Sequence, residues 1–244
     1  MTRRRIAIGA ARVLALGLAF GLTLVMAIGP ATGLAAVQST GPAVTGTAPD
    51  APCCGPTTPT GARLSKFLDG TGVDHLWLIG QRVNWETGET IAASTMPTTT
   101  HCSAFVAAIG ERLGVYVLRP PQHGQILLAN AQMSWLRDAG AAGGWRSLAG
   151  PVAAQAAANQ GDLVLEAFSN PNPRRPGHIA IVRPSEQSRA ALHRDGPRET
   201  QAGESNALDT STRLGFRGHR GAWAASGHGG LRYYAHTIDW SQPR

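Results

Sequence analysis

The spacing of apolar residues changes partway along the chain, and this change limits the fold more than any other feature. Apolar residues from Phe105 to Leu113 recur at the i, i+4 and i+3 spacings of one helix face, and Gly114 ends the pattern. Residues 163–168 and 179–182 are instead short apolar runs, typical of buried strands. Because helical segments come first and strands later, the sequence predicts an α+β fold with N-terminal helices packed on a small antiparallel sheet.

Other segments extend this scheme. We expect helices over residues 62–79, with a break at Gly70 or Gly72, and over 125–139 and 152–159. We expect two more strands over 199–202 and 231–238. A turn at residues 83–88 and a polar loop up to Thr100 come before the helix that contains Phe105, and Thr100 is its expected N-cap.

The first 36 residues have the features of a secretory signal peptide. Three arginines follow Met1 and Thr2, an apolar run reaches about Ile28, and small residues follow up to residue 36. The apolar run is also long enough to remain as a membrane anchor. We therefore expect an exported protein, periplasmic or extracellular, that contacts a membrane only if this segment is uncleaved.

Composition separates the rest of the chain into two parts. Residues 37–60 are rich in Thr, Pro, Gly and Ala without an apolar period, which indicates a linker, and the folded domain is predicted over residues 61–244.

The net positive charge is largely a property of the N-terminus. Four of the 22 Lys and Arg residues lie in the first twelve positions, so 18 basic residues remain against 15 acidic residues. The basic segments lack interleaved aromatic residues, and we expect no nucleic-acid partner.

The chain has three cysteines, an odd number for an exported protein. Cys53 and Cys54 are adjacent, and they could bridge to each other, pair with other chains, or include a partner for Cys102. A cysteine in the first turn of a helix lies close to unpaired backbone N–H groups, which stabilise a thiolate. We therefore predict that Cys102 is a reduced nucleophile with a lowered pKa. A disulfide from Cys102 to Cys53 or Cys54 would contradict this prediction.

A histidine at the start of an apolar strand is a candidate base for this thiol. His178 opens the run of residues 178–182, where it would be held rigidly at the edge of a cleft. A third polar residue should orient its imidazole. Asn206 is the first choice for this role, with Gln201 and Glu204 as alternatives. All three lie on or just after the next predicted strand, at residues 199–202. The eight histidines show no HExxH spacing and the cysteines no CxxC pair, so no metal site is expected.

Three motifs, in this order, resemble the NlpC/P60 and CHAP amidase superfamily: THCSAFV at residues 100–106, GDLV at 161–164 and GHIAIV at 177–182. The resemblance covers about residues 98–210. It implies a papain-like fold, no cofactor, and cleavage of amide bonds in bacterial peptidoglycan. It assigns Cys102 as nucleophile and His178 as base, and Glu204 to Asn206 is similar to the Glu-x-Asn that follows the histidine strand in CHAP domains.

The function expected from these features is thiol-dependent amide hydrolysis by a Cys-His-polar triad. The expected substrate is a stem-peptide bond or the muramoyl-alanine bond of peptidoglycan, or another peptide. Two alternatives stay open. One is a catalytically inactive binding or envelope domain of the same fold, with Cys102 oxidised to Cys53 or Cys54. The other is a cysteine peptidase or acyltransferase that acts on a protein.

Overall fold

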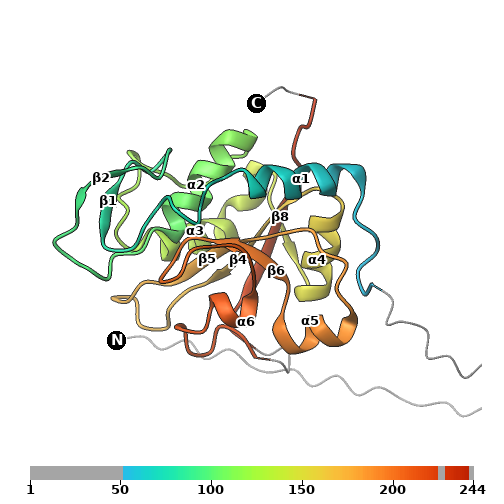
Figure 1. Ribbon diagram of the computed structural model, residues 1–244. Coiled ribbons are helices and arrows are strands. Elements are labelled where there is room, and N and C mark those ends of the chain that lie inside the picture. Colours follow the sequence, from blue (N-terminus) through green and yellow to red (C-terminus); the bar gives the residue numbers. More distant parts are fainter. Residues whose placement is uncertain (1–51, 225–228, 242–244) are drawn as a thin grey trace, which may run out of the picture. The chain divides into compact units, whose positions relative to one another are not determined.

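A computed structural model of the chain describes residues 52–224 and 229–241 (Figure 1). The predicted signal peptide and residues 37–51 of the predicted linker lie outside the described residues. The helices are α1 (Pro59–Asp69), α2 (Cys102–Leu113), α3 (Leu128–Asp138), the 3-10 helix η1 (Gly140–Gly143), α4 (Pro151–Asn159), α5 (Arg189–Asp195) and α6 (Thr212–Gly215). No helix in this part of the chain is long and apolar enough to cross a membrane.

Six strands form one antiparallel sheet in the order β3-β8-β4-β5-β6-β7. Their bounds are β3 (Arg146–Leu148), β4 (Leu163–Phe168), β5 (His178–Val182), β6 (Arg198–Gln201), β7 (Ala207–Ser211) and β8 (Arg232–His236). β1 (Gln81–Val83) and β2 (Thr90–Ala93) form a separate antiparallel hairpin. Every residue of the central strands β4 and β5 is buried, which accounts for their continuous apolar runs. The predicted α+β class with an antiparallel sheet is confirmed.

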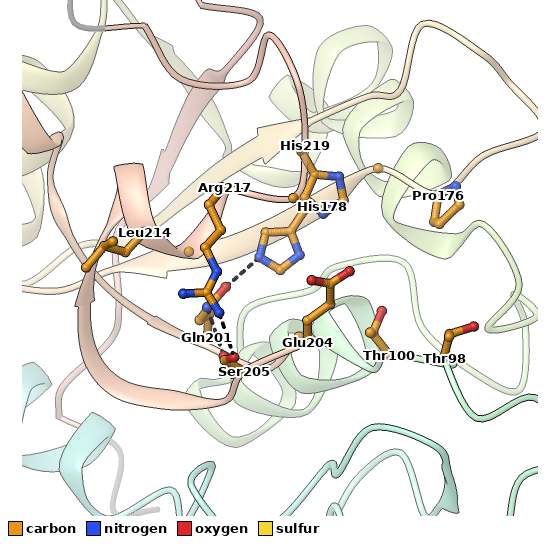
Figure 2. Close-up of a pocket in the computed structure, with 14 residues that line it drawn as sticks. Thr98, Thr100, Pro176, His178, Gln201, Glu204, Ser205, Leu214, Arg217 and His219 are labelled. Carbon is orange, nitrogen blue, oxygen red and sulfur yellow. Dashed lines mark hydrogen bonds between the residues drawn. The ribbon is translucent and has the colours of Figure 1, made fainter.

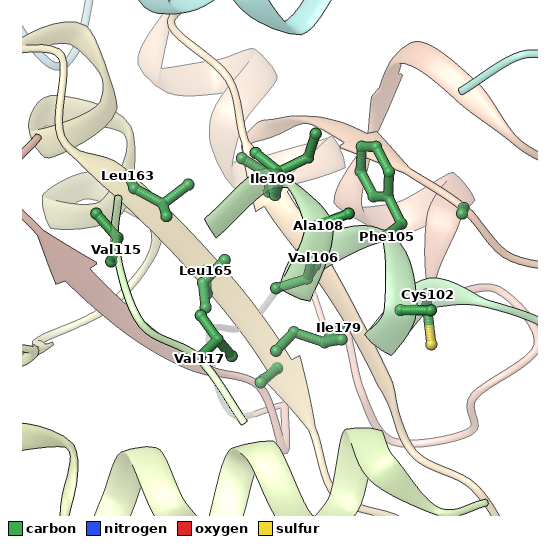
Figure 3. Packing of buried hydrophobic residues seen from close by; sticks show 14 of the residues in the cluster. Cys102, Phe105, Val106, Ala108, Ile109, Val115, Val117, Leu163, Leu165 and Ile179 are labelled. Carbon is green, nitrogen blue, oxygen red and sulfur yellow. The ribbon is translucent and has the colours of Figure 1, made fainter. Parts of the chain in front are cut away.

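Apolar cores lie on both faces of the sheet, because successive residues of a strand point to opposite sides. Ile179 and Ile181 belong to one core together with residues of α1, α2 and α3, part of which Figure 3 shows. Ala180 belongs to a second core with residues of α4 and with Phe216. His178 precedes Ala180 by two positions, so its side chain lies on the second face. α2, which carries Cys102, covers the first.

The folded part begins before residue 61, where the sequence predicted its start. Thr58, inside the predicted linker, caps α1 by accepting a hydrogen bond from the backbone N–H of Gly61. Its hydroxyl also donates to the backbone oxygen of Asn159, and Pro59 occupies the first turn. A Thr-Pro pair is a common helix start, which the linker-like composition around it concealed.

The structure also differs from the prediction in individual elements. The helix expected over residues 62–79 ends at Asp69 and does not resume after Gly70. β2 lies inside the predicted polar loop, and β1, β3, β7, α5, α6 and η1 were not predicted. All four residues of β2 are exposed, so no apolar alternation marks this strand in the sequence.

Candidate active site

The N-terminus of α2 lies at Cys102, with His101 as its N-cap. The prediction of Thr100 as N-cap is wrong, and no side chain caps this helix. The buried ring of His101 instead places Nε2 2.9 Å from the backbone oxygen of Gln81. The backbone N–H groups of the first turn are thus without a side-chain acceptor, next to the sulfur of Cys102.

Cys102 is a free thiol, because Cys53 and Cys54 form a disulfide with each other. Of the pairings that the sequence left open, this one keeps Cys102 available as a nucleophile. The binding-domain alternative in which Cys102 is oxidised to Cys53 or Cys54 does not agree with this pairing.

The pKa of Cys102 moves in the direction opposite to the prediction. The side chain is 5% exposed, and burial raises the pKa of its thiol to about 11. The backbone N–H groups of Ile179, Ser103 and Cys102 itself act to lower it, but they do not offset the loss of solvation. The sequence reveals the helix start, whereas the burial that decides the shift comes from residues distant in sequence.

We expect Cys102 to react slowly with alkylating reagents at neutral pH, since thiolate is the reactive form and little of it is present. Iodoacetamide labelling followed by peptide mapping should give a rate below that of free cysteine at pH 7, rising with pH up to about 11. Free cysteine labelled in parallel serves as the control. Labelling faster than this control at pH 7 would contradict the buried thiol.

His178 opens β5 and is held by aromatic rings on the second face of the sheet. Phe216 meets its imidazole edge-on at 4.6 Å between ring centroids, and His219 stacks on it at 5.0 Å with an interplanar angle of 11°. The preceding Gly177 is needed at this point, because a Cβ there would overlap the backbone oxygen of Phe168. With 3% of its surface exposed, His178 is fixed in position and shielded from solvent.

Gln201, on β6, is the predicted orienting candidate whose side chain contacts the imidazole. Its Oε1 lies 2.6 Å from Nε2 of His178, and its own Nε2 donates to the backbone oxygen of Ser205 at 3.0 Å. The second bond fixes which end of the amide faces the imidazole. Because Oε1 accepts only, Nε2 of His178 carries the proton and Nδ1 carries the lone pair.

The other two candidates lie elsewhere around the site. Asn206, the first choice, joins two loops: its Oδ1 accepts from Gly203, and its Nδ2 donates to the backbone oxygens of Val73 and Leu76. Glu204 is exposed and lines the cavity beside His178 (Figure 2). Neither side chain is hydrogen-bonded to the imidazole in the described part of the chain.

The imidazole of His178 is neutral at physiological pH. Burial, and then the neighbouring His219, lower its pKa to about 3, while the Gln201 hydrogen bond acts in the opposite sense. The neutral imidazole has a free lone pair on Nδ1, but a pKa of about 3 makes it a weak base toward a thiol whose pKa is about 11, so burial opposes proton transfer in this arrangement.

Cys102 and His178 lie at the same end of β5, with their side chains on opposite faces of the sheet. β6 pairs with β5 only at Ile181 and Val182, so β6 does not cover the beginning of β5. There the backbone N–H of Ile179 points toward the Cys102 sulfur, and Figure 3 shows the two residues near one another. No hydrogen bond joins the sulfur to the imidazole among the described residues. The structure thus brings the thiol to the backbone of Ile179, the residue after His178, and not to the imidazole itself.

Two hollows meet at this end of α2. A cavity of about 100 Å³ beside His178 is lined by Gln201, Glu204 and Arg217 among others (Figure 2). A second hollow, of about 330 Å³, is lined by Ser103, the neighbour of Cys102. The two share three lining residues, Thr98, Thr100 and Pro176. The two hollows thus adjoin at Thr98, Thr100 and Pro176, and Cys102 lines neither of them.

The sequence did not identify the residues that cover His178. Phe216 and His219 lie just after α6, in a segment with no recognisable motif. Their spacing of three residues after a strand is a weak helical-turn signal, and it does not indicate which strand the turn packs against.

Within the described ranges, no three His, Cys, Asp or Glu side chains are grouped so that they could hold a metal ion. The sequence matches no family model and no curated protein.

Proposed function

We propose that this protein is a thiol-dependent amide hydrolase with a papain-like arrangement, in which Cys102 is the nucleophile, His178 the base and Gln201 the orienting residue. The observation that carries the proposal is the hydrogen bond from His178 Nε2 to Gln201, because it leaves Nδ1 unprotonated at the same end of β5 as the free thiol that begins α2. The order of the three motifs, which resembles the NlpC/P60 and CHAP superfamily, supports the same roles.

The proposed reaction starts from a neutral pair. As the Cys102 sulfur forms a bond to the carbonyl carbon, its proton passes to Nδ1 of His178, and the carbonyl oxygen takes the negative charge. The C–N bond then breaks, and the imidazolium returns the proton to the leaving amine. Water next attacks the thioester, releasing the acid and restoring the thiol. An amine in place of water would make the same enzyme an acyltransferase.

Charge on the carbonyl oxygen needs preorganised donors. The first backbone N–H groups of α2, at Cys102 and Ser103, lie beside the sulfur and have no side-chain cap. Donors placed in this way stabilise an oxyanion next to a nucleophile at a helix start. They therefore suit the charged intermediate of the proposed reaction.

Replacing Gln201 should lower activity, whereas replacing Asn206 should lower stability. Gln201→Ala is expected to lower kcat by about 10- to 100-fold with little effect on folding, since the imidazole loses its orientation. Asn206→Ala is expected to lower the free energy of unfolding by about 1–3 kcal/mol, because it leaves buried backbone groups unpaired. Kinetics and thermal unfolding of both variants check this. The reverse pattern would return the orienting role to Asn206.

Peptidoglycan is the proposed substrate, because the expected export would bring the enzyme to a compartment in which stem peptides are the abundant amides. Either the muramoyl-alanine bond or a bond within the stem is the target. Incubating the protein with purified sacculi and analysing the fragments by mass spectrometry identifies it. New amine termini are expected with the parent and not with Cys102→Ala. Their absence under reducing conditions would favour a protein substrate or the inactive binding domain.

A further inference from the structure

Two glutamates lie fully buried beneath the candidate active site. Glu166 on β4 and Glu199 on β6 flank β5, and both are 0% exposed. Among the described residues, Oε1 of Glu166 and both side-chain oxygens of Glu199 have no hydrogen-bond donor. Buried carboxylates without a cationic partner are very unfavourable unless they are protonated. A proton held between the two carboxyl groups pairs Oε1 of Glu166 with one oxygen of Glu199 and removes one of the two buried charges.

The segment after β7 is attached to this pair. We call residues 212–219 the strap; it comprises α6 and the turn after it. The hydroxyl of Thr212 donates to Oε2 of Glu166 at 2.8 Å, and it also lies 3.2 Å from the backbone oxygen of Pro197. Gly215 packs so closely on Glu199 that a Cβ at this position would overlap Oε1 of Glu199. The first half of the strap, α6, thus contacts both carboxyl groups: Thr212 contacts Glu166, and Gly215 contacts Glu199.

The other end of the strap covers the candidate base. Phe216 and His219 are the two rings that contact the His178 imidazole, at 4.6 and 5.0 Å between centroids. Figure 2 shows His219 beside His178 at the cavity wall. The 3% exposure of His178 is therefore maintained in part by the strap.

We propose that the proton shared by Glu166 and Glu199 latches the strap over His178, so that loss of this proton releases the strap and opens the candidate active site. Glu166 and Glu199 are thus positioning residues, which act through Thr212 and Gly215. The link to catalysis rests on the proposed function, whereas the latch itself does not.

The groups around Glu166 and Glu199 determine whether the latch opens as pH rises or as pH falls. Burial raises the pKa of Glu166 to about 7, and burial together with the charge of Glu166 raises that of Glu199 well above its usual range. Arg198 acts in the opposite sense on Glu199, and the buried hydroxyl of Tyr233 faces both carboxyl groups. At the other end of the strap, His219 adjoins His178 and Glu204. The latch should hold at acidic and neutral pH and fail at alkaline pH, when both carboxyl groups ionise.

Hydrogen exchange measured by mass spectrometry from pH 6 to 10 tests the latch. Protection factors, corrected for intrinsic exchange, are expected to fall by about tenfold or more for residues 212–219, while those of β4 and β5 stay constant. Glu199→Gln cannot form the doubly charged state, and its strap should keep its protection. Thr212→Val, which lacks the hydroxyl, should lose protection at every pH. Glu89→Gln, an exposed change in a distant loop, should behave as the parent.

A second measurement follows His178 itself. Its pKa of about 3 keeps the imidazole neutral from pH 6 to 10, so a change in its rate of carbethoxylation reports access and not ionisation. The rate should rise with pH in the parent and stay flat in Glu199→Gln. Equal protection of the strap at pH 6 and 10 in the parent, or equal losses in parent and Glu199→Gln, would overturn the proposal. Neither readout uses amide hydrolysis, so a failed sacculus digestion would leave this test intact.

Discussion

Replacing Cys102 with alanine is expected to lower kcat for amide hydrolysis by about 10,000-fold or more, because the proposed acyl intermediate forms on the Cys102 sulfur. His178→Gln should cost a similar factor, since the thiol then has no base to accept its proton. Combining the two changes is expected to cost little more than the larger single change, because the two side chains act as one unit. Steady-state kinetics on a defined stem peptide measures all three variants.

Folding controls make this result interpretable. Cys102 and His178 are both buried, so truncation could disturb packing as well as chemistry. Glutamine keeps most of the volume of histidine, and circular dichroism with thermal unfolding should show intact folds. A folded His178→Gln variant with parental activity would remove His178 from the mechanism. Additive losses in the double variant would mean that the two residues do not act together.

The central strands could be predicted because burial imposes a pattern that the sequence carries locally. β4 matches the predicted residues 163–168, and β5 differs from 179–182 only by starting at His178. Both strands are covered on two faces, which requires an apolar residue at nearly every position. α2 was found for a similar reason, since its apolar side and the left-handed Gly114 mark its face and its end.

Elements on the surface escaped prediction because water imposes no such pattern. β2 is exposed throughout, and β7 mixes exposed, half-buried and buried positions without alternation. Each is placed by pairing with a neighbouring strand, β1 or β6, and such pairing depends on the backbone more than on side-chain type. The strap has no apolar period either, because it contacts the polar side chains of Glu166 and Glu199 as well as the second core.

The candidate site also combines features that the local sequence predicts with features that depend on tertiary packing. Cys102 and His178 could be proposed from the sequence because each lies at the start of an element that the sequence predicts, α2 and β5. The choice among Gln201, Glu204 and Asn206 depends on which side of β6 and its loop faces the imidazole, which the sequence does not specify. The direction of the Cys102 pKa was predicted wrongly for a related reason: a helix start is a local feature, whereas the burial of its first residue is tertiary.

The buried glutamates should also make stability depend on pH, in a direction set by their raised pKa values. A carboxyl group that binds its proton more tightly when folded stabilises the fold fully below its unfolded pKa, and this contribution is lost as pH rises through the folded value. For Glu166 the loss is centred on the range between about 4.5 and about 7, and Glu199 extends it to higher pH. From Glu166 alone the loss is on the order of 3 kcal/mol.

Glu199→Gln separates this contribution from those of other groups. The lowered pKa of buried His178 makes stability change with pH in the opposite direction. Between about pH 3 and 6.5 the unfolded chain binds a proton at His178 and the folded chain does not, so stability falls as pH is lowered through this range. Parent and variant share this histidine, so it cancels in their difference. Denaturant unfolding at intervals from pH 5 to 9 should show Glu199→Gln gaining stability relative to the parent as pH rises, by about 1–3 kcal/mol in total. A difference that stays constant over this range would mean that the two carboxyl groups do not share a proton.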